Sequence, residues 1–208
     1  MPRPKTQSDA SVLEAALTLM HEHGPEALTF AKLSQACGLS GATLVQRFRT
    51  KKELRQRTLL FAWDRLEEET ERLAASVPRT PEGAIRLLVG LTAQYGGIEA
   101  YAEGLLLRED LRDPVLRSRG VAWKAKLCEA LDACLARSPG AGQGAGLLAA
   151  THWQGALLWW AFDPRQKVED HVEDSLRRFV ATILAAGRRG RLTGNGARPS
   201  GRDAPARS

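Results

Sequence analysis

Residues 29–54, TFAKLSQACGLSGATLVQRFRTKKEL, carry the most informative pattern of the sequence. Apolar residues recur at helical spacing on both sides of Gly38, so two short helices can each turn one apolar face inward. The inward residues are Phe30, Leu33 and Cys37 before the glycine, and Leu44 and Phe48 after it. Two short helices that pack on a third around such a turn form a helix-turn-helix, whose second helix enters the major groove of DNA. The stretch therefore predicts a helix-turn-helix.

Three residues that cap helix N-termini divide this region into its elements. Thr29, Ser40 and Thr50 each stand directly before an apolar periodic run, where their hydroxyls can accept hydrogen bonds from the backbone of the first turn. Glu53 follows Thr50 at the spacing of a capping box. We expect helices over 9–23, from Thr29 to Ala36, from Ser40 to Phe48, and over 51–76.

The second short helix presents small and polar residues on the face that would meet DNA. These are Gly41, Ala42, Val45, Gln46 and Arg47. The small residues permit close approach to a duplex, whereas Gln46 can pair with adenine and Arg47 with guanine. Basic residues follow where the phosphate backbone would run, namely Arg49, Lys51, Lys52, Arg55 and Arg57. The motif thus predicts base contacts from one helix face and phosphate contacts beside it.

The net charge of +6 is unevenly distributed over the 208 residues. Residues 1–60 hold nine Lys and Arg against five Asp and Glu, residues 61–186 hold 15 against 18, and residues 187–208 hold six against one. A basic first quarter joined to a mildly acidic body suits a protein that places one end on nucleic-acid phosphates. A basic run by itself is usually a solvated face, so the charge supports DNA binding only together with the motif.

Beyond the motif, helical patterns dominate and no run alternates apolar and polar residues with period two. We predict an all-α fold of about nine helices, the other five lying over 81–95, 98–107, 114–137, 144–161 and 167–186. The chain divides into a helix-turn-helix domain over 1–50, a helical body over 51–186, and a basic tail over 187–208. We expect the tail to be disordered, because it is rich in Gly, Arg, Pro and Ser and has no apolar period.

The cysteines and the apolar segments indicate the compartment. Three cysteines without CxxC spacing argue against a disulfide framework or a structural zinc and fit a reducing compartment. No apolar signal segment follows the polar start, and the most apolar stretch, 146–162, is too short to span a membrane. His21 and His23 point to different sides of their helix, so they are no metal pair. We expect a cytoplasmic protein with no membrane partner, no metal site and no cofactor.

The motif residues resemble the tetracycline-repressor (TetR) family of transcription regulators. That family's motif runs roughly T-x3-[IL]-A-x2-[AG]-G-[VIL]-S-x-G-T-L-Y-x-[YH]-F-x-[SN]-K-x2-L. The chain matches it at Thr29, Leu33, Gly38, Leu39, Ser40, Thr43, Leu44, Phe48, Lys51 and Leu54. It departs where Ser34 and Cys37 replace small residues, Ala42 replaces glycine, Val45 replaces a phosphate-contacting tyrosine, and Arg47 replaces tyrosine or histidine.

The resemblance implies a DNA-binding regulator, by default a repressor released by a small apolar ligand. It implies that the body over 51–186 binds this effector, and that its last two helices form the interface of a homodimer on a palindromic operator. The residues predicted to contact DNA are Thr29, Lys32, Ser40, Gly41, Ala42, Thr43, Val45, Gln46, Arg47 and Lys51. An apolar stripe over Val168, Val172, Leu176, Phe179 and Ile183, together with small residues at Ala149, Ala150, Gly155 and Ala156, fits such an interface.

Aromatic residues of the body are candidates for an effector pocket. Tyr101, Trp123, His152 and Trp159 are the predicted ligand-binding residues, although aromatics at helical spacing serve a core or an interface more often. Trp159 and Trp160 are adjacent and face about 100° apart, so they cannot serve one surface. One could meet a pocket and the other a partner subunit.

Two alternatives to a DNA-binding regulator remain open. A helical dimer of the same fold could have lost operator binding and act through protein partners. The departures from the family motif at Val45 and Ala42 support this alternative. An enzyme could use a cavity of the helical body, but the sequence contains no nucleophile elbow, HExxH motif or other catalytic constellation. We therefore predict no catalytic residue and no enzymatic activity.

Overall fold

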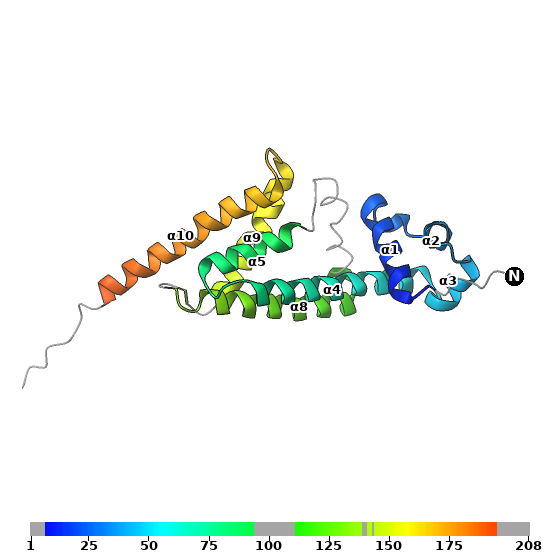
Figure 1. Ribbon diagram of the computed structural model, residues 1–208, viewed down its shortest axis with the longest axis horizontal. Helices are drawn as coiled ribbons and strands as arrows, with labels where there is room; N and C mark the ends of the chain where they lie inside the picture. The colour runs from blue at the N-terminus through cyan, green and yellow to red at the C-terminus, as the bar shows by residue number, and fades with distance from the viewer. Residues whose placement is uncertain (1–6, 94–110, 139–140, 143, 195–208) are drawn as a thin grey trace, which may run out of the picture.

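The computed structural model describes residues 7–93, 111–138, 141–142 and 144–194. Within these ranges the chain forms eight α-helices, one 3₁₀ helix and no strand, in agreement with the predicted all-α class (Figure 1). The elements are α1 (Asp9–His23), η1 (Pro25–Ala27), α2 (Phe30–Cys37), α3 (Gly41–Phe48), α4 (Lys51–Ser76), α5 (Pro81–Thr92), α8 (Pro114–Leu135), α9 (Ala145–Phe162) and α10 (Val168–Gly194).

The predicted caps set the starts of the helices around the turn. The hydroxyl of Thr29 accepts a hydrogen bond from the backbone of Lys32 at 3.2 Å, and Ser40 accepts one from Thr43 at 3.1 Å. Thr50 likewise accepts from the backbone N–H of Glu53 at 3.1 Å. Gly38 ends α2 with φ of 71°, in the left-handed region that glycine adopts without steric cost. Local sequence chemistry therefore fixes both ends of the helix-turn-helix.

The helix-turn-helix packs around its own apolar cluster at one end of the molecule (Figure 1). The cluster joins α1, α2, α3 and the first half of α4, and one residue of the body, Leu116 of α8, is buried within it. Its buried members are Val12, Leu13, Ala16, Leu17, Met20, Leu28, Leu33, Cys37, Leu44, Phe48, Leu54, Leu59 and Leu116. The inward residues predicted on α2 and α3 are thus confirmed except for Phe30, which is only half-buried.

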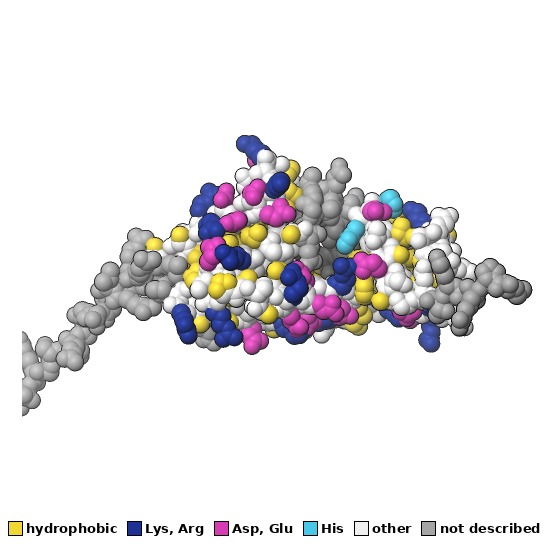
Figure 2. Space-filling view, viewed as in Figure 1, with side chains coloured by type: hydrophobic (Ala, Val, Ile, Leu, Met, Phe, Trp, Pro, Cys, Tyr) yellow, Lys and Arg dark blue, Asp and Glu magenta, His cyan; other side chains and the backbone are white. Residues whose placement is uncertain are grey.

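The 26-residue helix α4 connects this cluster to the core of the body. Its second half lies along α8, and the indole N–H of Trp123 donates to the Thr70 hydroxyl at 3.0 Å between the two helices. Ion pairs also join the two helices, with Arg119 lying 2.8 Å from Asp64 and Lys126 lying 2.8 Å from Glu71. Acidic and basic side chains are mixed over this face of the molecule (Figure 2). Displacement of α4 in the body would therefore also move the helix-turn-helix.

The body buries α5, α8, α9 and α10 against one another. Trp153 of α9 is fully buried, and its N–H donates to the Thr92 hydroxyl of α5 at 2.8 Å. Gly146 lets α9 approach α8, because a Cβ at this position would lie 2.4 Å from the carbonyl oxygen of Cys128. No helix in the described part of the chain is long and apolar enough to cross a membrane.

Two predicted helices differ from the structure or fall outside it. The helix expected over 98–107 lies outside the described residues. The last helix does not end at Ala186 as predicted but continues to Gly194, so residues 187–194 are helical. Gly187 and Gly190 each disfavour a helix by about 1 kcal/mol, but the arginines and the leucine between and after them are good helix formers. Residues 195–208 of the predicted disordered tail lie outside the described residues.

Candidate nucleic-acid interface

The outer face of α3 is open along most of its length. Leu44 and Phe48 are completely buried, which turns the opposite side of the helix to solvent. Ala42 and Gln46 are exposed, and Val45 retains 45% of its accessible surface. A Cβ added at Gly41 would meet no atom within 4 Å, so the start of the helix is also unobstructed. These four residues form the exposed face that the sequence predicts.

Hydroxyl groups cluster at the N-termini of α2 and α3. The hydroxyls of Ser40 and Thr43 lie 2.8 Å apart, and Thr29 caps the preceding helix. Backbone N–H groups and the positive end of the dipole at a helix N-terminus favour phosphate. Lys32 is exposed in the first turn of α2. This edge of the motif can therefore bind a phosphate backbone while α3 faces the bases.

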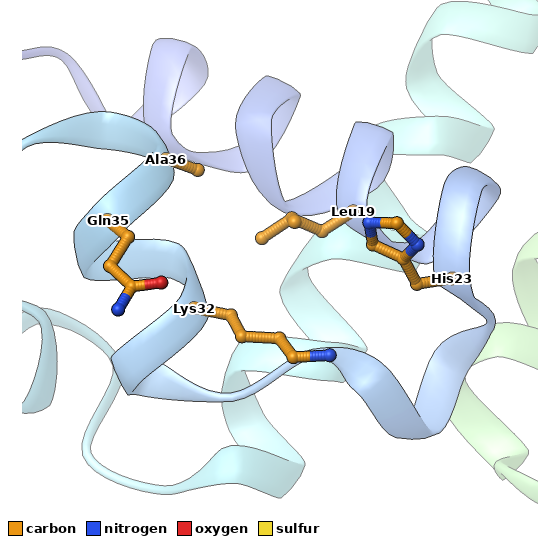
Figure 3. A pocket seen from close by; sticks show the side chains of 5 residues that line it. All are labelled: Leu19, His23, Lys32, Gln35 and Ala36. Atoms are coloured by element: carbon orange, nitrogen blue, oxygen red, sulfur yellow. The ribbon is translucent and has the colours of Figure 1, made fainter.

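A shallow depression lies between α1 and α2 next to this edge (Figure 3). Leu19, His23, Lys32, Gln35 and Ala36 line it, and apart from Leu19 all of them are exposed. Its open shape and flexible polar lining do not enclose a small molecule. The depression leaves Lys32 room to reach toward a duplex.

Lys51 stands at the start of α4 beside an acidic residue of η1. Its Nζ lies 3.2 Å from the Glu26 carbonyl oxygen and 3.4 Å from the carboxylate, while Arg55 binds the same carboxylate at 3.0 Å. The Arg55 guanidinium, followed by the Lys51 ammonium, lowers the pKa of the Glu26 carboxyl below its ordinary value. Exposed ion pairs of this kind contribute little to stability, so phosphate can compete with Glu26 for Lys51.

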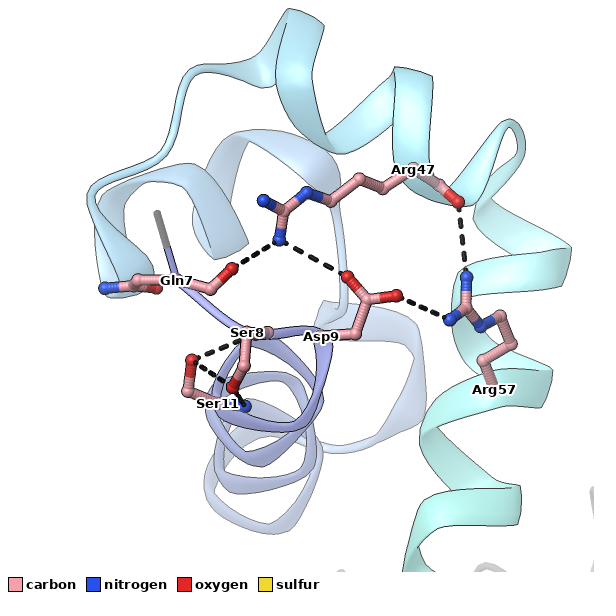
Figure 4. A network of polar contacts seen from close by, with 6 residues as sticks. All are labelled: Gln7, Ser8, Asp9, Ser11, Arg47 and Arg57. Atoms are coloured by element: carbon pink, nitrogen blue, oxygen red, sulfur yellow. Dashed lines mark hydrogen bonds and ion pairs between the residues drawn. The ribbon is translucent and has the colours of Figure 1, made fainter. Parts of the chain in front are cut away.

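The structure corrects the predicted outward position of Arg47. Only 24% of its side chain is accessible, and it turns back toward the start of α1 (Figure 4). Its Nη1 donates to the Gln7 carbonyl oxygen at 2.8 Å and to the Asp9 carboxylate at 3.3 Å. Arg57 of α4 completes the group by binding the other Asp9 oxygen at 2.8 Å. The prediction of outward exposure is therefore wrong for Arg47, because Asp9 and Gln7 provide polar partners inside the domain.

Sequence reasoning missed Asp9 and the role of Arg57. Asp9 is an acidic first-turn residue of α1, which already suits the helix dipole and gives no hint of a distant partner. Arg57 belongs to a basic run that could equally be solvated or bind phosphate. Asp9 pairs with Arg47 and Arg57 only once α1, α3 and α4 are packed together, so the sequence gives no local signal for this group.

The predicted ligand-binding residues do not gather in one place. Trp123 is buried between α8 and α4, its ring 5.5 Å from that of Trp63. His152 is half-buried between α9 and α10, where its Nε2 lies 2.9 Å from the Ser175 hydroxyl and its ring stacks on Phe179. Trp159 is 69% exposed, and Tyr101 lies outside the described residues. The neighbouring Trp160 is buried and donates to the Gln166 carbonyl, so the two tryptophans do face different surroundings.

The apolar stripe expected at a subunit interface is instead part of the chain's own core. Val168, Val172 and Leu176 of α10 are buried in the body, as are Ala149, Ala150 and Ala156 of α9. The face of α9 that remains open is a different one. It carries the exposed apolar residues Leu147, Leu148, Leu158, Trp159 and Phe162. Amphipathic periodicity alone does not distinguish a stripe that packs inside one chain from a stripe that packs on a second chain.

Comparison with known proteins agrees with this geometry. Residues 12–58, which span the helix-turn-helix and the start of α4, match the sequence profile of "Bacterial regulatory proteins, tetR family". Comparison with curated protein sequences gives no match.

Solved structures share the fold over nearly their whole length. A transcriptional regulator from Rhodococcus sp. Rha1 has 17% identity and a TM-score of 0.69, covering 86% of this chain and 97% of its own. A TetR-family transcriptional regulator from Streptomyces coelicolor has 20% identity and a TM-score of 0.62, covering 86% and 96%. A transcriptional regulator from Saccharomonospora viridis, in complex with choline, has 18% identity and a TM-score of 0.64, covering 82% and 93%.

The sequence match covers the domain that carries α3, and the structural likeness extends the same fold to the helical body. Both agree with the exposed recognition face and the capped helix termini described above. Residues 12–58 thus match the sequence profile of the TetR family, and the chain as a whole shares the fold of solved transcriptional regulators, one of which is a TetR-family member.

Proposed function

We propose that the protein is a homodimeric, sequence-specific DNA-binding regulator, each protomer of which places α3 in the major groove of one half of a palindromic operator. The observation that carries this proposal is the open face of α3, flanked by hydroxyl-capped helix N-termini and by the cations of α4. A helix of this width fits the major groove, where each base pair presents a distinct pattern of donors and acceptors. The half-sites would lie about one helical turn apart.

Different residues would contact bases and phosphates. Gln46 would read a base edge, and the Val45 side chain would contact a thymine methyl group, with Gly41 and Ala42 allowing close approach. The residues assigned to phosphates share a place on the flank of α3 or at a helix start: Thr29, Lys32, Ser40, Thr43 and Lys51. Phosphate contacts would fix the register of the protein on DNA, and base contacts would supply the sequence preference.

The open face of α9 supports a second copy of the chain as the dimer partner. Trp159 is 69% exposed and Phe162 75% exposed, with ring centroids 5.8 Å apart. Leu158 lies beside them on the same face, and Leu147 and Leu148 lie on it near the start of the helix, with Thr151 and Gly155 between. Exposed apolar patches often mark an interface, and in a two-fold dimer this patch would face the same patch of the second copy. We place the interface here, with the adjoining part of α10 at its margin.

Release by a small organic effector would act through α4. This helix takes part in both apolar clusters, and Leu116 of α8 inserts into the cluster of the helix-turn-helix. Gln56 also donates to the Asp113 carboxylate at 2.8 Å, where Asp113 caps α8. A ligand that shifts α8 would therefore move α3 relative to its counterpart in the dimer, with a coupling energy of about 1–3 kcal/mol. The choline complex of the similar S. viridis regulator supports a small-molecule effector. Repression of the regulated gene is the default that the family resemblance implies.

Selection from random duplex DNA by the purified full chain tests the proposal. We expect enrichment of a palindrome with half-sites about one turn apart, bound by two copies of the chain. Recovery of no sequence, with only weak and strongly salt-dependent binding, would contradict it. That result would favour the alternative of a helical dimer that acts through protein partners, for which the exposed Val45 in place of a polar residue is the supporting observation.

A further inference from the structure

We infer that Asp9, Arg47 and Arg57 form a clamp that positions the recognition helix, and that Arg47 serves DNA binding through this clamp rather than by touching the duplex (Figure 4). The inference rests on the proposed function of α3. It reassigns the one long cationic side chain of the recognition helix from reading DNA to holding that helix in place.

The clamp joins three elements through a single carboxylate. One oxygen of Asp9, at the start of α1, accepts from Arg47 of α3 at 3.3 Å, and the other accepts from Arg57 of α4 at 2.8 Å. Arg57 also donates to the Arg47 carbonyl oxygen at 3.2 Å, which closes the connection between α3 and α4. Arg47 in turn holds the carbonyl oxygen of Gln7 at 2.8 Å, immediately before α1.

The recognition helix needs this additional fixation because few side chains anchor it. Only Leu44 and Phe48 are buried on α3, and two residues four apart on one helix define a line about which the helix can roll. The clamp adds a third point off that line, at the last turn. Arg57 also lies over the Phe48 ring, 4.8 Å from its centroid, so the apolar anchor and the polar one are in contact.

The turn after α3 adds a reason for the clamp. Arg49 has φ of 56° and ψ of −59°, and the N–H of Thr50 donates to the Phe48 carbonyl oxygen at 2.5 Å. This is a γ-turn of the rare, strained kind with positive φ. Strained turns persist where the surrounding structure determines their geometry, and the Arg57 bond to the last turn of α3 contributes to that.

Arg47 would have to give up its side-chain hydrogen bonds to Gln7 and Asp9 in order to reach a base. Its side chain uses Nη1 for two acceptors, is 24% accessible, and points toward α1 rather than along the open face of α3 (Figure 4). Gln46 and Val45 are exposed on the open face of α3 and take no part in the clamp. Sequence preference therefore depends on those two residues, and Arg47 sets the angle at which they meet the groove.

A double-mutant cycle with a matched charge control tests the clamp. The variants are D9A, R47A and D9A/R47A, with E14A as control. Glu14 lies on the same helix, is equally exposed (50% against 48% for Asp9), and pairs with Arg65 of α4 without touching α3. Each protein is titrated with the selected operator and with random duplex DNA over a range of salt concentrations, and its helical content and unfolding temperature are recorded.

The clamp predicts that D9A weakens operator binding, although it removes a negative charge from a DNA-binding domain. D9A and R47A should each lose roughly tenfold in affinity for the operator, the double variant should lose no more than either single one, and E14A should lose nothing. The slope of log affinity against log salt should be unchanged for R47A, because no phosphate contact is lost.

Direct DNA contact by Arg47 predicts the opposite pattern. The losses would then add, the salt slope of R47A would fall by about one, and D9A would bind at least as tightly as E14A; any of these would overturn the clamp. If D9A does not fold, D9N, which keeps one acceptor and loses the charge, replaces it in the cycle. Absence of operator selection by the wild-type chain would refute the proposed function itself, so the two failures are distinguishable.

Discussion

At the scale of single residues, Gln46 and Lys51 illustrate the two ways in which this domain would hold DNA. Gln46 is exposed on the open face of α3, whereas Lys51 lies at the start of α4 beside Glu26. We expect Q46A to lose about 1–3 kcal/mol of preference for the correct base at one operator position. K51A should weaken operator and random DNA alike and lower the salt slope by about one.

Titrations of both variants with the operator, with single-base operator variants and with random duplex check this division. Equal losses on every duplex for Q46A, or a loss confined to one base position for K51A, would contradict it. Glu26 provides a further check, because E26Q removes the carboxylate that competes for Lys51 and should strengthen binding to all duplexes.

The sequence predicts the exposed face of α3 because helical spacing of two buried residues determines which side remains outside. It does not predict the direction of Arg47, a long side chain that can bend back to a partner on another helix. The decisive residue, Asp9, is 38 positions away. The direction of such a long side chain depends on tertiary packing and cannot be predicted from the spacing of residues along the helix.

At the level of the secondary-structure elements, the backbone of the turn between α3 and α4 is strained at Arg49. Arg49 is exposed and is the non-glycine residue of the described chain with positive φ. Glycine would adopt this conformation without the steric cost of about 1–3 kcal/mol. It would also give the unfolded chain more conformational freedom, which opposes folding by about 1 kcal/mol. We expect R49G to raise the free energy of unfolding by about 1 kcal/mol, measured by chemical denaturation. A decrease would show that the turn stores no strain.

The contact between α8 and α9 depends on the absence of a side chain at Gly146. A Cβ there would lie 2.4 Å from backbone oxygen, so G146A should destabilise the protein by about 1–3 kcal/mol in spite of alanine's higher helix propensity. Gly155 on the same helix has open space around its Cβ position, and G155A is the matched control. Denaturation curves that place G146A at or above G155A would refute the close approach.

Element boundaries follow the sequence where the signal is local. Thr29, Ser40 and Thr50 cap their helices as predicted, because a hydroxyl and the backbone of the next turn lie within a few residues of each other. The end of α10 does not follow the local signal. Gly187 and Gly190 disfavour a helix, but the good helix formers around them offset this cost. Here the helix continues to Gly194.

At the scale of the whole molecule, the open apolar face of α9 is the strongest indication of a second subunit. W159D combined with F162D places two charges in the proposed interface, and we expect the dimer dissociation constant to rise about 100-fold or more. V121D, on an exposed apolar residue of α8, is the control and should leave the dimer intact. Sedimentation of the three proteins distinguishes the outcomes, and an unchanged dimer in the double variant would place the interface elsewhere.

Fold class and the position of the DNA-binding end could be predicted from the sequence, because the motif of residues 29–54 and the helical periods are local. The sequence proposes the last two helices as the dimer interface, and the structure shows which of their apolar faces is already covered by the chain itself. Val168, Val172 and Leu176 have the period of an amphipathic helix and are buried inside the chain, whereas Trp159 and Phe162 remain open. Periodicity shows that a face is apolar, and only the packed structure shows what already covers it.

Two copies of α3 that read DNA in adjacent major grooves would both lie on one face of the duplex. Protection of guanine N7, a major-groove atom, from methylation in the selected duplex shows whether they do. We expect two patches of protected guanines about one helical turn apart. Uniform reactivity along the bound duplex, or protection of a single patch, would contradict it.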